Sequence, residues 1–299
     1  MTSRTAAGSA HKNWSERVEA ARFLFRKGLS KLPYAPVPVW LPLGNNETVK
    51  FWWSYIVPYF DPERGFFDYW GHDVADLEFL WRALQPGMIF LDIGAYHGIY
   101  SLVAAKRLKG SGHIIAFEPS PREFARLRLH LRWNRVHSAR AECCAVGARS
   151  EEKEFFQVSS GDTSRSGLRA PASKDPLRQF TVRAESLDNY LADSGLDRVD
   201  VVKLDVEGGE LDVLRGASSL LERYRPLFVC EVLDAATEPW GYEAREIVST
   251  FSARDFEWFD FRPGGCLSRH SIQDCYPVVR NYLAIPREKL ASLSEQMIP

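Results

Sequence analysis

The stretch IFLDIGAYHGIYSLVAAKRLKG, residues 89–110, combines a carboxylate and two glycines at the end of an apolar run. Asp92 and Gly94 close the apolar run, and Gly98 precedes a segment with helical spacing. A glycine in such a turn permits positive φ and lets the backbone approach a ligand closely. In an open α/β sheet, ligands bind beyond the carboxyl ends of the strands. The sequence therefore predicts a ligand-binding turn over residues 92–98.

The residues of this turn argue against a phosphate ligand. A dinucleotide-binding turn has the pattern G-x-G-x-x-G, but Tyr96 stands where its second glycine would be. A P-loop needs Gly-Lys-Ser/Thr, and the chain has Ile99 and Tyr100 after the turn instead. The Asp92 carboxylate would repel a phosphate and would suit a cationic group. An NAD-dependent oxidoreductase is therefore disfavoured.

A second carboxylate follows the next apolar run, in the segment IIAFEPSP. Glu118 stands 20 residues after Gly98, where an acid can accept hydrogen bonds from both hydroxyls of a ribose. The alternative is a charge that stabilises the N-terminus of a helix beginning near Pro119. A ribose without a phosphate-binding turn points to S-adenosylmethionine, which carries a cationic sulfonium and an ammonium group. Its methionine end would lie over Asp92 and Gly94.

A third acidic segment, VDVVKLDVEGGELDVLRGA, covers residues 199–217. Side chains alternate faces along a strand, so Lys203, Asp205 and Glu207 point the same way. Asp205 falls at the carboxyl end of the strand, where the chemistry is expected. A buried lysine needs a partner, so Lys203 is either a site residue or a salt-bridged strut, with Glu207 or Glu118 as its partner. Glu207 either caps the turn or supports the site.

Several motifs, taken in order, resemble the FkbM-type methyltransferases. The turn LDIGAYHGIYS is similar to that family's D-[VI]-G-A-N-x-G-x-[YF]-[ST], and AFEPSPREFARLRLHLRWN to its F-E-P segment. The acidic segment is similar to the family's K-[IL]-D-[VI]-E-G-x-E motif, and CAVGARSEEKEFF and AESLDNYL also fit in order and spacing. The resemblance covers about residues 86–235. Tyr96 departs from it, because the family usually has Asn there.

The resemblance implies an α/β, Rossmann-like class I methyltransferase fold, with a mostly parallel seven-stranded sheet and helices on both faces. It implies S-adenosylmethionine as cofactor and an in-line methyl transfer to a hydroxyl of a sugar or another small-molecule natural product. The expected cofactor contacts are Asp92, Gly94, Ala95, Tyr96, Gly98, Glu118, Pro119, Ala145, Val146 and Asp205. The candidates for a catalytic base are Asp205 and, after it, the histidines His97 and His72.

Two alternatives to this interpretation stay open at the level of the sequence. Asp205 and Glu231, which ends an apolar run in VCEV, could converge at adjacent strand ends and hold Mg²⁺. We expect no metal, because no third ligand is evident. The replacement of Asn by Tyr96 also permits a noncatalytic scaffold that keeps the fold. Its interactions would then involve an N-terminal helix.

The wider pattern places these motifs in alternating strands and helices. Strands are expected at 89–93, 113–117, 140–146, 199–205, 226–232, 254–260 and 280–285, and helices at 76–84, 99–109, 121–133, 208–222 and 242–251. Nearly continuous apolar strands are typical of a parallel sheet covered on both faces. The insert at 148–180 predicts a β-ribbon with a polar loop. We expect an N-terminal extension over residues 1–85, helical and aromatic-rich with disordered first residues, and a methyltransferase domain over 86–299.

The composition limits the classes of protein to which the chain could belong. With 299 residues, of which 45% are hydrophobic, the chain can bury a sizeable core. The net charge of −1 argues against a general nucleic-acid binder. No apolar run approaches the ~20 residues that span a bilayer, no secretory signal is evident, and the five cysteines show no C-x-x-C spacing, so a cytoplasmic location is expected. An amphipathic helix over residues 14–32 packs on the body or binds a membrane surface or partner, and could form a homodimer.

Overall fold

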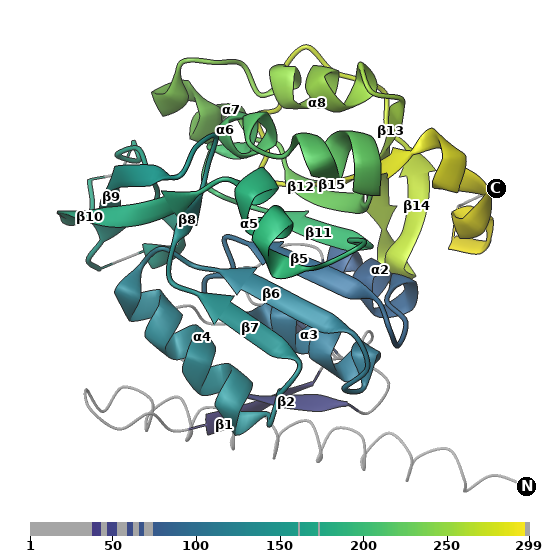
Figure 1. The fold of residues 1–299 in the computed structure, drawn as a ribbon, viewed down its shortest axis with the longest axis horizontal. Coiled ribbons are helices and arrows are strands. Elements are labelled where there is room, and N and C mark those ends of the chain that lie inside the picture. The colour runs from purple at the N-terminus through teal and green to yellow at the C-terminus, as the bar shows by residue number, and fades with distance from the viewer. Residues whose placement is uncertain are drawn as a thin grey trace, which may run out of the picture.

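The computed structural model describes residues 38–42, 47–52, 59–61, 66–68, 74–160, 162–172 and 174–296. Its body is an eight-stranded sheet with helices on both faces (Figure 1). In spatial order the strands are β14 (Cys266–Arg269), β13 (Phe256–Arg262), β15 (Asn281–Pro286), β12 (Leu227–Glu231), β11 (Val201–Leu204), β5 (Ile89–Ile93), β6 (His113–Phe117) and β7 (Ala139–Glu142).

The order of the strands creates a switch point in the middle of the sheet. From β5, the chain adds β6 and β7 in parallel on one side. It then returns to add β11 and β12 in parallel on the other side. The last strand, β15, inserts antiparallel between β12 and β13. A crevice is expected beyond the carboxyl ends of β5 and β11, where the direction of winding reverses.

Helices cover the sheet on both faces because its strands are apolar on both faces. The helices α2 (Ala75–Ala83), α3 (Ile99–Leu108) and α4 (Pro121–Trp133) share one hydrophobic core, and α5 (Leu187–Ser194), α6 (Glu210–Arg215) and α8 (Arg245–Ser252) share the other. Phe90 of β5 belongs to the first core and its neighbour Leu91 to the second, since successive side chains of a strand point to opposite faces. The predicted α/β fold with a mostly parallel, doubly covered sheet is confirmed.

The insert forms the predicted ribbon. The strands β9 (Glu151–Val158) and β10 (Leu177–Glu185) pair antiparallel. The short strand β8 (Ala145–Val146) pairs in parallel with β10 and not with the main sheet. The single strand predicted at 140–146 was therefore wrong: its first half is β7, and its second half leaves the sheet to support the ribbon.

Three further differences from the predicted pattern concern short elements. The eighth strand, β14, has four residues, too few for alternation to register in the sequence. The helix predicted at 208–222 is interrupted, because α6 ends at Gly216 and a π-helical segment, η2 (Ser219–Tyr224), follows. A Cβ at Gly216 would lie 2.4 Å from the carbonyl oxygen of Gly147, so the chain passes too close for a side chain. The helix α5 was not predicted.

The N-terminal part contributes two small hairpins, β1 (Pro38–Pro42) with β2 (Thr48–Trp52) and β3 (Tyr59–Asp61) with β4 (Phe66–Asp68). The remaining short elements are α7 (Asp234–Thr237), η1 (Thr163–Arg165), η3 (Glu238–Trp240), η4 (Pro263–Gly265) and η5 (Arg287–Gln296). The helix predicted at 14–32 and His72 lie outside the described residues. The domain boundary at residue 85 stays a prediction, although α2 packs into the same core as β5.

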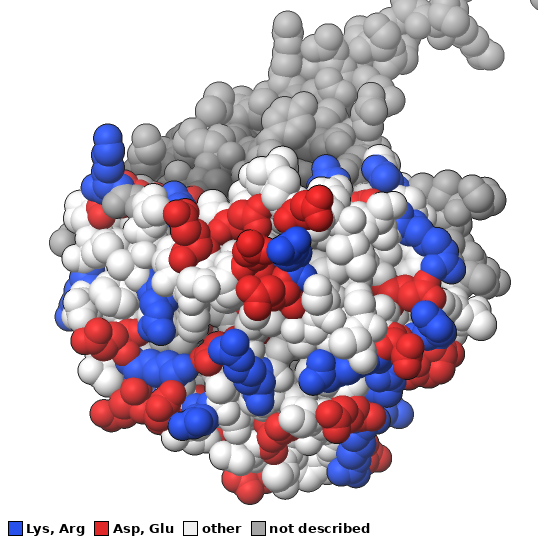
Figure 2. Space-filling model, turned by 90° about the horizontal axis from the view of Figure 1, so that it is seen from above, with Lys and Arg blue, Asp and Glu red and all other residues white. Residues whose placement is uncertain are grey.

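Charged side chains are distributed over the surface without one dominant sign on the face that Figure 2 shows, where Lys and Arg alternate with Asp and Glu. Of the helices in the described ranges, none combines the length and the apolar character that a membrane span requires.

Candidate active site

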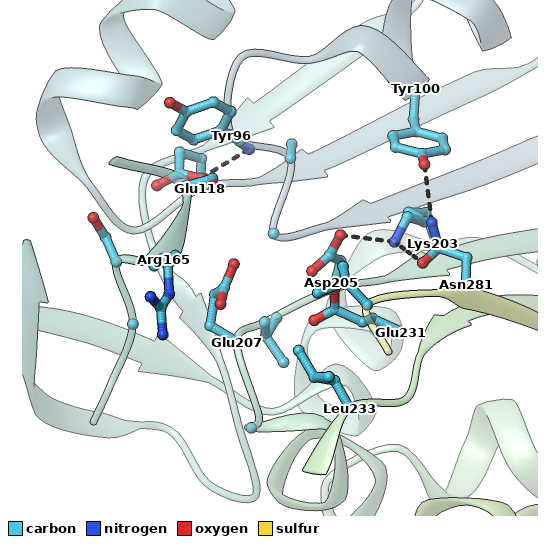
Figure 3. Close-up of a pocket in the computed structure, with 18 of the residues that line it drawn as sticks. Tyr96, Tyr100, Glu118, Arg165, Lys203, Asp205, Glu207, Glu231, Leu233 and Asn281 are labelled. Atoms are coloured by element: carbon cyan, nitrogen blue, oxygen red, sulfur yellow. Dashed lines mark hydrogen bonds and ion pairs between the residues drawn. The ribbon is translucent and has the colours of Figure 1, made fainter. Parts of the chain in front are cut away.

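A cavity of about 610 Å³ opens at the carboxyl ends of the central strands. This volume lies within the range of small-molecule sites, ~300–1,000 Å³. Of the residues proposed from the sequence, those that line the cavity are Gly94, Ala95, Tyr96, Glu118, Pro119, Ala145, Val146, Lys203, Asp205, Glu207 and Glu231. Figure 3 shows how several of these side chains, from separate strands, face the same space. The structure thus brings together motifs that are more than 100 residues apart.

The glycine turn is shaped by the segment that crosses it. Gly94 has φ +82°, and a Cβ there would lie 1.7 Å from the carbonyl oxygen of Asp205. The backbone N–H groups of Gly94 and Ala95 donate to the carbonyl of Phe117, and the N–H of Asp205 donates to Ile93. The ends of β5, β6 and β11 are therefore tied together, and only glycine fits at their crossing.

Asp92 lies beneath the turn and does not line the cavity. Its Oδ2 accepts hydrogen bonds from the N–H and the hydroxyl of Ser101, at 3.0 and 2.5 Å, which fixes the first turn of α3. Its Oδ1 is buried and has no hydrogen-bond partner among the described residues. Burial raises the pKa of Asp92 to about 6, against the opposing effect of Ser101.

This shifted pKa predicts a pH-dependent difference between wild type and Asp92→Asn. The carboxyl ionises near pH 3.8 in the unfolded chain but near pH 6 in the folded protein. Because the unfolded state loses its proton first, this group lowers stability progressively between those pH values and has a constant effect above them. The stability of wild type relative to Asp92→Asn should therefore fall by up to about 3 kcal/mol from pH 4 to pH 6.5. Urea unfolding across this range measures it, and a pH-independent difference contradicts the assignment.

Glu118 joins the end of β6 to the glycine turn. Its carboxylate is 5% exposed and accepts hydrogen bonds from the backbone N–H of Tyr96 at 2.9 Å and of Ser120 at 2.7 Å. Burial raises the pKa of Glu118 to about 8, although these two hydrogen bonds oppose the shift. The side chain therefore presents a carboxyl group to the cavity in a fixed orientation.

Tyr96 links the turn to the insert. Its φ is +48°, and its phenol oxygen lies 2.5 Å from Oγ1 of Thr163 in the loop after β9. Burial raises the pKa of the phenol. The loop residues from Asp162 to Leu168 line the cavity, so the contact holds this loop over the turn.

His97 lies in a buried cluster and does not line the cavity. Its Nε2 is 2.6 Å from Oε2 of Glu123 and 3.1 Å from a guanidinium nitrogen of Arg126, both in α4. Burial lowers the pKa of His97 in spite of Glu123. Gly98 packs against the same helix, since a Cβ there would lie 2.4 Å from Leu127. His97 and Gly98 thus do not line the cavity, although the ring of His97 stacks on that of Tyr96, with 3.7 Å between the centroids.

Lys203 is buried and pairs with Asp205. Its Nζ donates to Oδ2 of Asp205 and to Oδ1 of Asn281, both at 2.9 Å. The prediction that Glu207 or Glu118 is the partner of Lys203 was wrong. Residues two apart on a strand point to the same face, so Lys203 and Asp205 meet directly. Burial alone would lower the pKa of Lys203, but the nearby carboxylates, led by Asp205, outweigh it and raise the pKa. The lysine therefore fixes the orientation of the Asp205 side chain, which is 31% exposed and lines the cavity.

Three residues of this network, Asp76, Tyr100 and Asn281, were not predicted from the sequence. The Nδ2 of Asn281 donates to Oδ2 of Asp76 at 2.5 Å, and the hydroxyl of Tyr100 donates to the same oxygen at 2.7 Å. Asp76 comes from α2 and Asn281 from β15, and both line the cavity (Figure 3 labels Tyr100 and Asn281). An acid within the apolar helix pattern DLEFLWRAL was the one available signal for Asp76.

The acids around Asp205, among them Glu207 and Glu231, form a floor rich in carboxyl groups. Burial raises the pKa of Glu207 and of Glu231 well above the usual range, and their neighbouring carboxylates add to the shift. Within the described ranges, no group of three or more His, Cys, Asp or Glu side chains is arranged to hold a metal ion. Asp205 and Glu231 line the same cavity.

The two ends of the cavity differ in character, and together they fit S-adenosylmethionine. Ala145 and Val146 line it beside Phe117 and Phe155, and all four are buried, which gives a flat apolar wall suited to a purine. The carboxyl group of Glu118 can accept hydrogen bonds from hydroxyl groups, and the carboxyl-rich floor suits a sulfonium and an ammonium group.

The fold and this cavity define a Rossmann-like class I methyltransferase. The family described as Methyltransferase FkbM domain matches residues 92–258, more than half of the 299 residues, and the chain belongs to this family. Membership supports methyltransferase activity and S-adenosylmethionine as the cofactor.

Individual relatives are distant. The chain is 26% identical over 244 residues to the AMB antimetabolite synthetase AmbE of Pseudomonas aeruginosa. The match covers 69% of this chain and 11% of that protein. It is 27% identical over 142 residues to Methyltransferase 1 of Beauveria bassiana, 42% of this chain and 57% of that protein. It is 26% identical over 162 residues to the 2-O-methyltransferase NoeI of Sinorhizobium fredii, 48% of this chain and 63% of that protein. The chain spans less than two thirds of each of these relatives.

Among solved structures, the chain is similar to Methyltransferase FkbM from Methylobacillus flagellatus KT. The TM-score is 0.41 at 16% identity, and the match covers 70% of this chain and 52% of that one.

Proposed function

We propose that the protein transfers the methyl group of S-adenosylmethionine to a hydroxyl oxygen of a sugar or another small-molecule natural product. The observation that carries the proposal is the meeting of the Gly94 turn, Glu118 and Asp205 at one cavity, at the switch point of the sheet. Transfer to oxygen is supported by the similarity to NoeI, which is named a 2-O-methyltransferase.

The proposed cofactor contacts are residues that line the cavity. Glu118 would bind the ribose, Ala145 and Val146 the adenine, and the turn at Gly94 the methionine end, close to Asp205. When bound, the cofactor supplies a methyl group on a positively charged sulfur, ready for in-line attack. The protein's part is to hold this group and an acceptor oxygen at near-attack distance, which contributes up to ~7–11 kcal/mol in favourable cases.

Asp205 is the group proposed to accept the proton of the acceptor hydroxyl. It is partly exposed and lines the cavity, and the ion pair with Lys203 fixes its orientation. Lys203 is in turn held by Asn281, so the base is supported from the neighbouring strands. A positioned base of this kind contributes about 10²–10⁴-fold to a rate.

Calorimetric titration with S-adenosylmethionine and S-adenosylhomocysteine tests the proposal. We expect binding by wild type and an affinity at least about tenfold weaker in Glu118→Ala, because leaving buried ribose hydroxyls without an acceptor costs ~1–3 kcal/mol. Glu154→Ala is the matched control, since Glu154 lies on the exposed side of β9 and contacts Gln179. Unchanged affinity in Glu118→Ala contradicts the ribose assignment. No binding by wild type favours the noncatalytic scaffold.

A further inference from the structure

Two arginines line the end of the cavity that the cofactor assignment leaves unused. Arg262 ends β13, and Arg280 precedes β15. The pairing of these strands sets Asp260 opposite Tyr282, and two further residues along the same register bring Arg262 opposite Arg280. The two side chains are 46% and 53% exposed, so both guanidinium groups are accessible from solvent.

These two cations share one carboxylate. Oxygen atoms of Asp260 lie 3.7 Å from Nη2 of Arg262 and 3.8 Å from Nη1 of Arg280. Both distances exceed the ~2.7–2.9 Å of a charge-assisted hydrogen bond. Asp260 also faces Nδ1 of His270 at 3.3 Å, and Nε of Arg262 donates to Ser268 at 2.8 Å. Two guanidinium groups and one carboxylate leave a net positive charge at this edge of the cavity, which we call the arginine rim.

Apolar side chains accompany the arginine pair. Val278 and Val279 line the cavity, yet they are 62% and 44% exposed. Leu233 and Phe261 line the same cavity. Exposed apolar side chains at the mouth of a pocket are typical of a surface that a ligand covers.

The strand order separates this rim from the proposed cofactor contacts. Those contacts come from β5, β6 and β8, whereas the arginines come from β13 and β15. The strands β11 and β12 lie between β5 and β15, so at about 4.8 Å per strand the arginine pair is ~14–19 Å from the line of β5. Asp205 and Glu231, at the ends of β11 and β12, stand between the two regions. The rim is therefore placed for the acceptor.

We infer that the acceptor is an anionic hydroxy compound: an apolar body that carries one carboxylate or phosphate group, held by Arg262 and Arg280. Carboxyl groups of Asp205, Glu207 and Glu231 crowd the floor, where an anion is disfavoured, while the arginine rim attracts it, so the orientation with the anion at the rim is favoured. In that orientation its hydroxyl group faces Asp205. The planar guanidinium forks suit both carboxylate and phosphate oxygens. This inference rests on the proposed methyl transfer and narrows its substrate class.

The test measures binding of matched ligands to the protein saturated with S-adenosylhomocysteine. The probes are 8-hydroxyoctanoate, its neutral methyl ester and 8-hydroxyoctyl phosphate, titrated calorimetrically. We expect at least one of the anions to bind about tenfold or more tightly than the ester, and the two anions to distinguish carboxylate from phosphate recognition. The preference should be lost in the double variant Arg262→Gln/Arg280→Gln. It should persist in Arg269→Gln, because Arg269 pairs with Glu257 outside the cavity.

A variant with increased affinity provides a second, independent measurement. Asp260→Asn removes the shared carboxylate while leaving both arginines, so it should strengthen binding of the preferred anion and leave the ester unaffected. Two outcomes overturn this inference and leave the proposed methyl transfer untouched. One is equal affinity for the anions and the ester. The other is no binding of either anion by a protein that binds S-adenosylhomocysteine. Weaker S-adenosylhomocysteine binding in the arginine double variant also overturns it, because the pair would then hold the cofactor's carboxylate. Failure of wild type to bind S-adenosylhomocysteine rejects the proposed function as well.

Discussion

Asp205→Asn is expected to lower kcat by about a hundredfold or more, without a comparable change in the affinity for S-adenosylhomocysteine. The amide keeps the size and hydrogen-bonding capacity of the side chain but no longer accepts a proton. In the structure Asp205 is the partly exposed acid at the end of β11, oriented by its 2.9 Å contact with Lys203. Initial rates of S-adenosylhomocysteine formation at saturating acceptor measure the effect.

Asp205→Asn should also lower the stability of the protein, because it breaks the ion pair with Lys203. This effect can be measured separately from turnover. Removing the carboxylate leaves the buried charge of Lys203 without its ion-pair partner, in contact with neutral amide acceptors such as Asn281. Breaking a buried pair in this way costs about 3–5 kcal/mol, so Asp205→Asn should also unfold at lower urea concentration. In Asp205→Asn/Lys203→Met the buried charge is absent, so stability should recover while turnover stays low.

The control for this series is Asp274→Asn, which removes a fully exposed carboxylate that does not line the cavity. It should leave both turnover and stability unchanged. If Asp205→Asn keeps more than about a tenth of wild-type turnover, proton acceptance by this group contributes little, and positioning of the reactants accounts for the rate. Recovery of turnover in the double variant would instead assign the loss to unfolding.

The central part of the fold could be predicted because its signals are local. Each parallel strand near the switch point is an apolar run ended by glycine, proline or an acid, and the following helices show clear periodicity. Where the outcome depended on distant pairing, the sequence was insufficient. The strand at 140–146 divides between two sheets because β10, which follows about 30 residues later, offers β8 a partner.

The candidate site shows the same division. Gly94, Glu118 and Asp205 could be placed together in advance, since the carboxyl ends of neighbouring parallel strands meet at one edge of a sheet. Their roles stay predictions. The contact between Lys203 and Asn281 joins residues 78 positions apart, and β15 reaches this place only by inserting between two earlier strands. No local pattern indicates such an insertion, nor that the ring of His97 turns toward α4 and away from the cavity.

Gly94→Ala is expected to be the most destabilising substitution in the turn, by more than about 3 kcal/mol, and to abolish cofactor binding. Positive φ costs an alanine ~1–2 kcal/mol, and an overpacked methyl group adds ~1–3 kcal/mol or more. The added Cβ would lie 1.7 Å from the carbonyl oxygen of Asp205, which belongs to a backbone held by its own hydrogen bond to Ile93. Neither segment can move aside without breaking the junction of β5 and β11. Urea unfolding and S-adenosylhomocysteine titration measure the two effects.

Gly110→Ala separates the two causes, because Gly110 has nearly the same φ, +78°, and no atom within 4 Å of the added Cβ. Its destabilisation should be limited to the conformational cost of ~1–2 kcal/mol, with cofactor binding intact. The difference between the two variants therefore measures the collision with Asp205 alone. Equal destabilisation by both would mean that the crossing of the two turns is loose. The glycine would then be required for its φ, and the fixed geometry on which the proposed positioning of Asp205 depends would lose its support.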